Sequence, residues 1–100
     1  MKSPEEQNSN EEKYQKLVDQ LYASSTWPNQ YLFKFILLKD PIQEKKLLAI
    51  FDNMGAVITS KLSKTEKYIS FSIQAKFNSP EDIIIKYKEV GQKIKGILSL

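Results

Sequence analysis

Residues 67 to 77 read KYISFSIQAKF, a run in which polar and apolar side chains alternate without a break. Successive side chains of a β-strand point to opposite faces of its sheet, so this period of two predicts a strand with one buried and one open face. The predicted core side holds Ile69, Phe71, Ile73, Ala75 and Phe77, and the predicted open side holds Tyr68, Ser70, Ser72, Gln74 and Lys76.

A second run, QYLFKFILL at residues 30 to 38, shows the same alternation in a more apolar form. Its aromatic and branched side chains are typical of strands, and its low polarity predicts a place in the middle of the sheet. Phe33, Phe35 and Leu37 share one side, whereas Lys34 marks the other side as the less buried one. Two shorter strands are expected, at residues 56 to 62 and 97 to 100.

Two helix starts lie between the predicted strands. Asp40-Pro41 and Ser79-Pro80 each place a capping residue before a proline, and proline fits the first helical position because that backbone nitrogen has no partner within the helix. We expect the first of these helices to have Gln43 at its capping-box site and to end at Gly55. The second helix should end near Gln92.

The sequence divides the chain into three parts. A polar start without apolar periodicity predicts a disordered tail. The helical spacing of Leu17 and Leu21, followed by Trp27-Pro28, then predicts an amphipathic helix and a stiff linker. The corresponding ranges are residues 1–8 for the tail, 9–29 for the N-terminal helix and linker, and 30–100 for the main domain.

The expected order of elements is helix, strand, helix, strand, strand, helix, strand. This order belongs to the α+β class and predicts a ferredoxin-like βαββαβ antiparallel sheet with two helices on one face, plus the N-terminal amphipathic helix. The opposite sheet face stays half apolar. We expect the N-terminal helix to pack on or beside that open face, in its own chain or in a dimer mate.

The composition of the 100-residue chain removes most catalytic chemistry. Histidine and cysteine are absent, so the usual general base near neutral pH and the thiolate nucleophile are missing. The acid pairs Glu11-Glu12 and Glu81-Asp82 lie in predicted first helical turns, where the helix dipole accounts for them. We therefore expect no metal site, no cofactor and no enzymatic activity.

Charge and hydropathy bear on location and partners. All fifteen basic residues are lysines, and the formal net charge of +3 combines an acidic residue range 1–29 with a basic range 30–100. Neither a long apolar run nor a signal-peptide pattern occurs, which predicts a cytoplasmic protein without a membrane partner. An RRM-like, RNA-binding sheet is the least favoured alternative, because arginine is absent and the open side of residues 67–77 lacks paired aromatic rings.

The open sheet face carries the first candidate site. Lys34 beside Ser70 and Ser72 offers one cation and two hydroxyls to a carboxylate, and Tyr68 lies on the same side. These residues suggest a regulatory or binding module that senses a small carboxylate-bearing ligand in the manner of ACT domains. The competing interpretation is a solvated sheet face without a ligand.

A second candidate surface is formed by the N-terminal helix and its linker. Leu17, Leu21 and Trp27 either complete the core of their own domain or form a surface for a protein partner. In the second case the chain is a protein-interaction or homodimerisation module. The sequence leaves both interpretations open.

Three groups of short motifs follow one another between residues 27 and 96. They are Trp27-Pro28 with Tyr31 to Ile36, Ser63-Lys64 with Lys67 to Ile73, and Ser79-Pro80-Glu81 with Tyr87 and Ile94-Lys95-Gly96. Together they resemble the YbeD-like family, a group of small bacterial domains of unknown function with an ACT-like fold.

The resemblance implies the fold, a bacterial cytoplasmic setting and a regulatory role that is sometimes described as lipoate binding, and it brings no catalytic residue. That family usually has a glycine after the Ser-Lys of the turn between the middle strands, where this chain has Thr65-Glu66.

Overall fold

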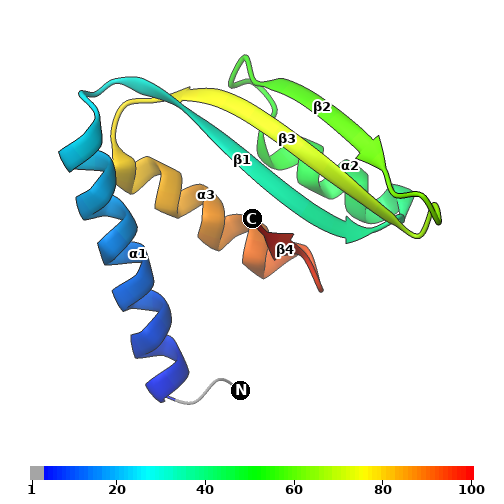
Figure 1. Ribbon diagram of the computed structural model, residues 1–100, viewed down its shortest axis with the longest axis horizontal. Coiled ribbons are helices and arrows are strands. Elements are labelled where there is room, and N and C mark those ends of the chain that lie inside the picture. Colours follow the sequence, from blue (N-terminus) through cyan, green and yellow to red (C-terminus); the bar gives the residue numbers. More distant parts are fainter. Residues whose placement is uncertain (1–3) are drawn as a thin grey trace.

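The computed structural model describes residues 4 to 100, and the side chains of residues 10 to 100. Four strands form one antiparallel sheet in the order β2-β3-β1-β4, and three helices complete an α+β chain, as the sequence predicts (Figure 1). The elements are α1 (Pro4–Ser24), β1 (Asn29–Leu38), α2 (Pro41–Ile50), β2 (Val57–Leu62), β3 (Tyr68–Phe77), α3 (Pro80–Lys93) and β4 (Leu98–Ser99).

The pairing of β1 with β3 joins the two alternating runs along their whole length. Phe35 lies opposite Phe71, and Lys34 lies opposite Ser72. Residues that are directly opposite in an antiparallel pair point to the same face, so the apolar halves of both runs fall on one side of the sheet. β2 extends the sheet beyond β3, and β4 extends it beyond β1.

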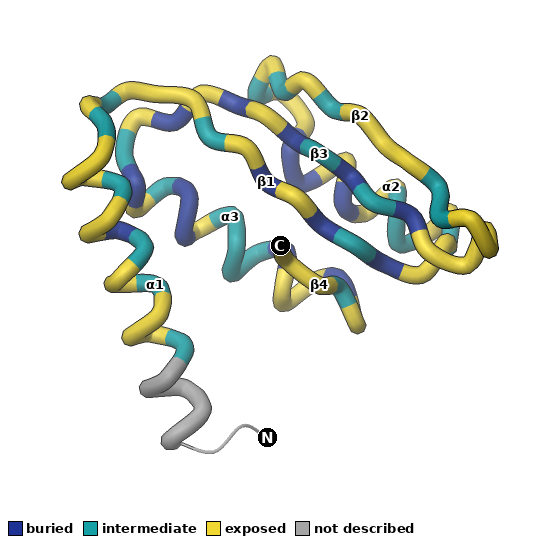
Figure 2. Tube along the Cα trace, viewed as in Figure 1, coloured by how far each residue is buried: buried dark blue, intermediate teal, exposed yellow. Residues whose placement is uncertain are grey.

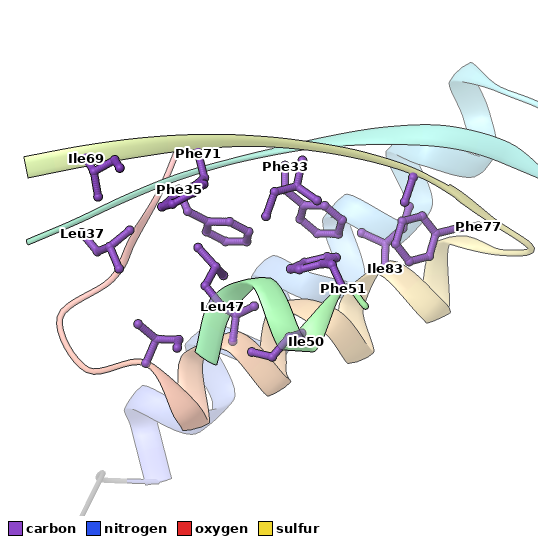
Figure 3. Close-up of a cluster of buried hydrophobic side chains, with 14 residues drawn as sticks. Phe33, Phe35, Leu37, Leu47, Ile50, Phe51, Ile69, Phe71, Phe77 and Ile83 are labelled. Carbon is purple, nitrogen blue, oxygen red and sulfur yellow. The ribbon is translucent and has the colours of Figure 1, made fainter. Parts of the chain in front are cut away.

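α2 and α3 cover the apolar side of the sheet, as expected, and the core fills the space between the two layers (Figure 3). Phe33 is fully buried, and its ring centroid lies 5.1 Å from that of Phe51 and 4.9 Å from that of Tyr87. The core cluster consists of Phe33, Phe35, Leu37, Leu47, Ile50, Phe51, Ile69, Phe71, Ile73, Ala75, Phe77, Ile83, Val90 and Ile94.

The start of α2 is capped reciprocally, but by a different residue from the expected one. Asp40 Oδ1 accepts a hydrogen bond from the Ile42 N–H at 2.9 Å, and the Asp40 N–H donates to Glu44 Oε2 at 3.0 Å. Glu44, one position beyond Gln43, therefore closes the cap. The side-chain oxygen of Gln43 is instead buried without a hydrogen-bond partner.

α2 ends at Ile50, earlier than the expected end at Gly55. The Lys86 ammonium of α3 donates to the Ile50 carbonyl at 2.6 Å and so satisfies one of the carbonyls that a helix end leaves free. The chain then turns through Asn53 and Gly55, whose φ values are 64° and 65°. Asparagine and glycine adopt this left-handed conformation most readily, which lets the chain reverse into β2.

The structure places α1 against α3, so the expectation that this helix packs on the open sheet face of its own chain is wrong (Figure 1). Two buried hydrophobic residues lie outside the main core, Val18 on α1 and Ile84 on α3, and their burial fits the α1–α3 contact. α1 also begins at Pro4, within the expected tail. Residues 1 to 3 of that tail lie outside the described residues.

Polar contacts fix α1 along the same stripe of α3. The Tyr22 hydroxyl donates to the Glu81 carboxylate at 2.5 Å, and Lys88 Nζ lies 3.0 Å from Glu11 Oε1. Lys88 Nζ also lies 5.6 Å from the centre of the Tyr14 ring. Positions 81, 84 and 88 share one face of an α-helix. A buried apolar contact with a polar contact at each end therefore holds α1 on this face of α3. The other side of the sheet is left uncovered.

Phe33→Ala should lower the free energy of unfolding by about 3 to 5 kcal/mol, the range for truncating a buried aromatic residue. Leu32→Ala is the matched control, because its side chain is 46% exposed on the opposite face and should cost less than about 1 kcal/mol. Urea denaturation of both variants measures the two costs. Equal costs would mean that the assignment of the two faces is wrong.

Tyr22→Phe should raise the pKa of Glu81 toward 4.5, because the hydrogen bond from Tyr22 lowers that pKa in the folded chain. A lowered folded-state pKa means that charged Glu81 supports the α1–α3 contact above about pH 4.5 and that this support is lost as the pH falls through the folded value. An NMR titration of the Glu81 carboxyl measures the change. Tyr68→Phe serves as the control, and an unchanged Glu81 pKa in Tyr22→Phe would exclude the contact.

Candidate functional site on the open sheet face

The side of the sheet that faces away from α2 and α3 brings together polar side chains from three strands. Thr59 of β2 lies opposite Ser72 of β3, which lies opposite Lys34 of β1. The alternation along β1 and β3 is visible in Figure 2 as bands of buried and more exposed residues. One cation and two hydroxyls therefore form a row across the sheet.

The neighbouring row adds a second cation. Lys61 of β2 lies opposite Ser70, which lies opposite Ile36, and Ile36 pairs with Leu98 of β4. The Ser70 hydroxyl donates to the Lys61 carbonyl at 3.2 Å, which leaves the oxygen of Ser70 able to accept a further hydrogen bond. This second row thus changes from polar on β2 and β3 to apolar on β1 and β4.

A hollow of about 450 Å³ lies over these two rows. Its lining contains no acidic side chain and includes both lysines, four hydroxyl residues (Thr59, Ser60, Ser70 and Ser72), Ile36 and Leu100. A second hollow of about 460 Å³ shares Ile36, Lys61 and Ser70 and adds Tyr68. The two hollows form one continuous open-face site with a cationic and hydroxyl-bearing centre.

The cations of the open-face site are available to a ligand. Lys34 and Lys61 are exposed, and neither forms an ion pair with any residue from 10 to 100. The lysines that do form ion pairs in this part of the chain all belong to α3. Because no acidic side chain lines the hollow, Lys34 and Lys61 make its side-chain lining cationic.

Apolar side chains surround the polar centre of the open-face site. Leu38 is 54% exposed and Leu98 is 61% exposed, and both are on the same side of the sheet as Ile36. Exposed apolar side chains grouped around a polar centre are typical of a binding surface. The site can therefore contact both a charged group and an apolar group of one ligand.

The structure separates the residues that the sequence singles out. Lys34, Ser70 and Ser72 line one hollow, and Tyr68 lines the adjoining one. Leu21 and Trp27 instead pack against the edge of the core, where the Trp27 indole N–H donates to the Leu21 carbonyl at 3.3 Å. Leu17 is partly buried on α1.

Sequence reasoning misses Lys61 and Thr59, because their place depends on the register between β2 and β3. The turn between these strands sets that register. It closes with a hydrogen bond from the Glu66 N–H to the Ser63 carbonyl at 2.9 Å and holds Glu66 at a φ of 60°. No glycine marks this left-handed position, so the local sequence carries little signal for the turn type.

The other side of the sheet has one titratable pair of its own. The hydroxyls of Tyr31 and Tyr87 lie 2.7 Å apart, and burial raises the pKa of Tyr87 well above its usual value. The hydrogen bond between the two hydroxyls holds both rings in place. In the described part of the chain, no cluster of three or more acidic side chains is placed to hold a metal ion.

The chain matches no protein-family model, no curated protein and no solved structure. Within residues 4 to 100, no helix combines the length and the apolar character that crossing a bilayer requires. The geometry of the sheet and its open-face site is therefore the basis for assigning a function.

Proposed function

We propose that the chain is a non-catalytic binding module whose open-face site takes a small ligand bearing a carboxylate. The sheet order β2-β3-β1-β4, with α2 and α3 on one side, supports a ferredoxin-like arrangement of the ACT type. The resemblance to YbeD-like domains supports the same fold and a regulatory role. In this proposal, ligand binding itself is the function, and no bond is made or broken.

The observation that carries the proposal is the shared hollow of Lys34 and Lys61. Their strands are separated by β3, so the two backbones are about two strand spacings, or 10 Å, apart, and both long side chains can reach a group between them. Ser72 and Thr59 lie in the same row across the sheet as Lys34. A carboxylate held there accepts charge-assisted hydrogen bonds from the lysines and further bonds from the hydroxyls.

The apolar border supplies the second part of the recognition. A carboxylate ligand with a short hydrocarbon portion can place that portion on Ile36 and Leu98 while its charged end stays near the lysines. Burying this portion adds about 25 cal/mol for each Å² removed from water. We therefore favour an amphiphilic carboxylate over a purely polar anion.

A protein-interaction module is the second candidate, and the exposed leucines of the same face favour it. A face-to-face homodimer is less favoured, because two-fold packing would bring Lys34 and Lys61 against a second set of the same cations. RNA binding has little support, since Tyr68 is the only aromatic side chain on this side of β1, β2 and β3.

Hexanoate should bind the open-face site and shift the NMR signals of Lys34 and Ser72, whereas hexanol and hexylamine should bind more weakly. Lys34→Gln should weaken hexanoate binding about two- to fivefold, the effect of losing one exposed ion pair. Lys76→Gln is the matched control, because it removes one positive charge from the same side of the sheet at a β3 position outside the two hollows. Equal affinities for hexanoate and hexylamine would contradict a carboxylate site.

A further inference from the structure

The outer edge of β2 offers a row of backbone hydrogen-bonding groups without a strand to pair with. β2 is the terminal strand of the sheet. The Ser63 N–H bonds to the Tyr68 carbonyl at 2.9 Å, and hydrogen-bonded positions recur every second residue in an antiparallel pair. Thr59 and Lys61 therefore direct their backbone groups to β3, and Ile58 and Ser60 direct theirs outward.

This edge has few of the features that protect a terminal strand from pairing. β2 contains six residues, VITSKL, without proline or glycine, and Lys61 is its only charged residue. The strand at the opposite end of the sheet, β4, has only two residues. Long unprotected edges are templates for an additional strand.

A hollow of about 590 Å³ lies directly beside this edge, between β2 and the end of α2. Leu48 of α2 and Ile58 and Ala56 line it, and Leu48 remains 37% exposed. Ile58 and Ser60 lie opposite Ile73 and Phe71, so the hollow is on the helix side of the sheet, away from the open-face site.

A strand added to the edge would use both features. Its backbone would pair with Ile58 and Ser60, and alternate side chains would enter the hollow and contact Leu48. The remaining side chains would point to the opposite side of the sheet, next to Thr59 and Lys61. Asp52 and Asn53 also line the hollow, so apolar side chains of the added strand would lie against Leu48, Ala56 and Ile58.

The charges near this edge indicate which residues fit the remaining positions of the added strand. Lys61 is the charged residue of β2, and it lies on the side of the sheet where the remaining side chains of an added strand would lie, whereas Lys64 and Glu66 are both exposed in the following turn and offset each other. Asp52 is the one acidic residue that lines the hollow. Lys61 favours acidic side chains on that side of the incoming strand, and a second copy of β2, whose sequence is VITSKL, would bring no acidic side chain there.

We propose that the β2 edge and the hollow beside α2 bind an extended acidic peptide segment of another protein by strand addition. The segment alternates aliphatic residues, which enter the hollow, with acidic residues, which face Lys61. Thr59, Ser60 and Phe71 line both this hollow and the open-face hollow on the other side of the sheet, but strand addition at the edge does not depend on the proposed carboxylate ligand.

The test uses a fluorescently labelled hexapeptide of alternating glutamate and valine, with a lysine–valine hexapeptide as the charge control. Fluorescence anisotropy should show that the acidic peptide binds and that the basic peptide does not. The backbone amides of Ile58 and Ser60 should exchange about tenfold more slowly when the acidic peptide is bound. Binding should weaken as salt is added.

Ser60→Pro removes one outward N–H without touching the pairing with β3, a position where an edge strand tolerates proline. It should weaken peptide binding about tenfold, the effect of leaving one backbone partner unsatisfied, whereas Ser60→Ala should not. Leu48→Asp is a second variant that keeps the edge intact and makes the hollow anionic, and it should weaken binding similarly. Lys76→Gln, which removes a lysine outside these hollows, should leave peptide binding unchanged.

Three results would overturn the proposal. One is equal binding of the acidic and basic hexapeptides. Another is unchanged binding to both Ser60→Pro and Leu48→Asp. The third is a doubled native mass with the Ile58 and Ser60 amides protected before peptide is added, because a second copy would then occupy the edge.

Discussion

The pairing of β1 with β3 in one register is the constraint on which the rest of the structure depends. A shift of one residue would turn Phe33 and Phe35 to the side of the sheet that now carries Ser70 and Ser72, since side chains alternate with a period of two. The correct register instead sets Phe35 opposite Phe71 and gives α2 and α3 one continuous apolar surface to cover. The same register collects Lys34 and the hydroxyls on the other side, so a single set of backbone hydrogen bonds creates both the core and the open-face site.

The position of α1 decides whether the open-face site can function. α1 buries its apolar stripe against α3, where Val18 and Ile84 are buried and the Tyr22 hydroxyl donates to Glu81. This helix therefore does not pack on the open face of the sheet. The proposed ligand site and the proposed edge site therefore lie on surfaces that the described chain leaves free. They meet at Lys61, whose side chain belongs to the open face and whose strand forms the edge, and occupation of one site would change the electrostatic potential at the other.

The sequence predicts the features that depend on local patterns, and it misses those that depend on distant pairings. The alternation in β1 and β3 identifies both strands and their faces, and Asp40-Pro41 and Ser79-Pro80 place the starts of α2 and α3 correctly. The docking of α1 escapes prediction because Glu81, Ile84 and Lys88 resemble any exposed helical stripe until a partner covers them. The roles of Lys61 and Thr59 likewise depend on the β2–β3 register, which a turn without glycine does not specify.

Solvent access to the open sheet face is measured most directly by NMR with a soluble paramagnetic agent at low protein concentration. If that face is free, Leu32, Leu38 and Leu98 should show strong relaxation enhancement, while Leu37, Leu47 and Ile73 in the core should show little. The contrast between Leu37 and Leu38 is the sharpest comparison, because the two are adjacent in sequence and point to opposite faces. Equal protection of both sets would show that α1 or a second copy covers the face, and it would contradict the separation of core and binding surface.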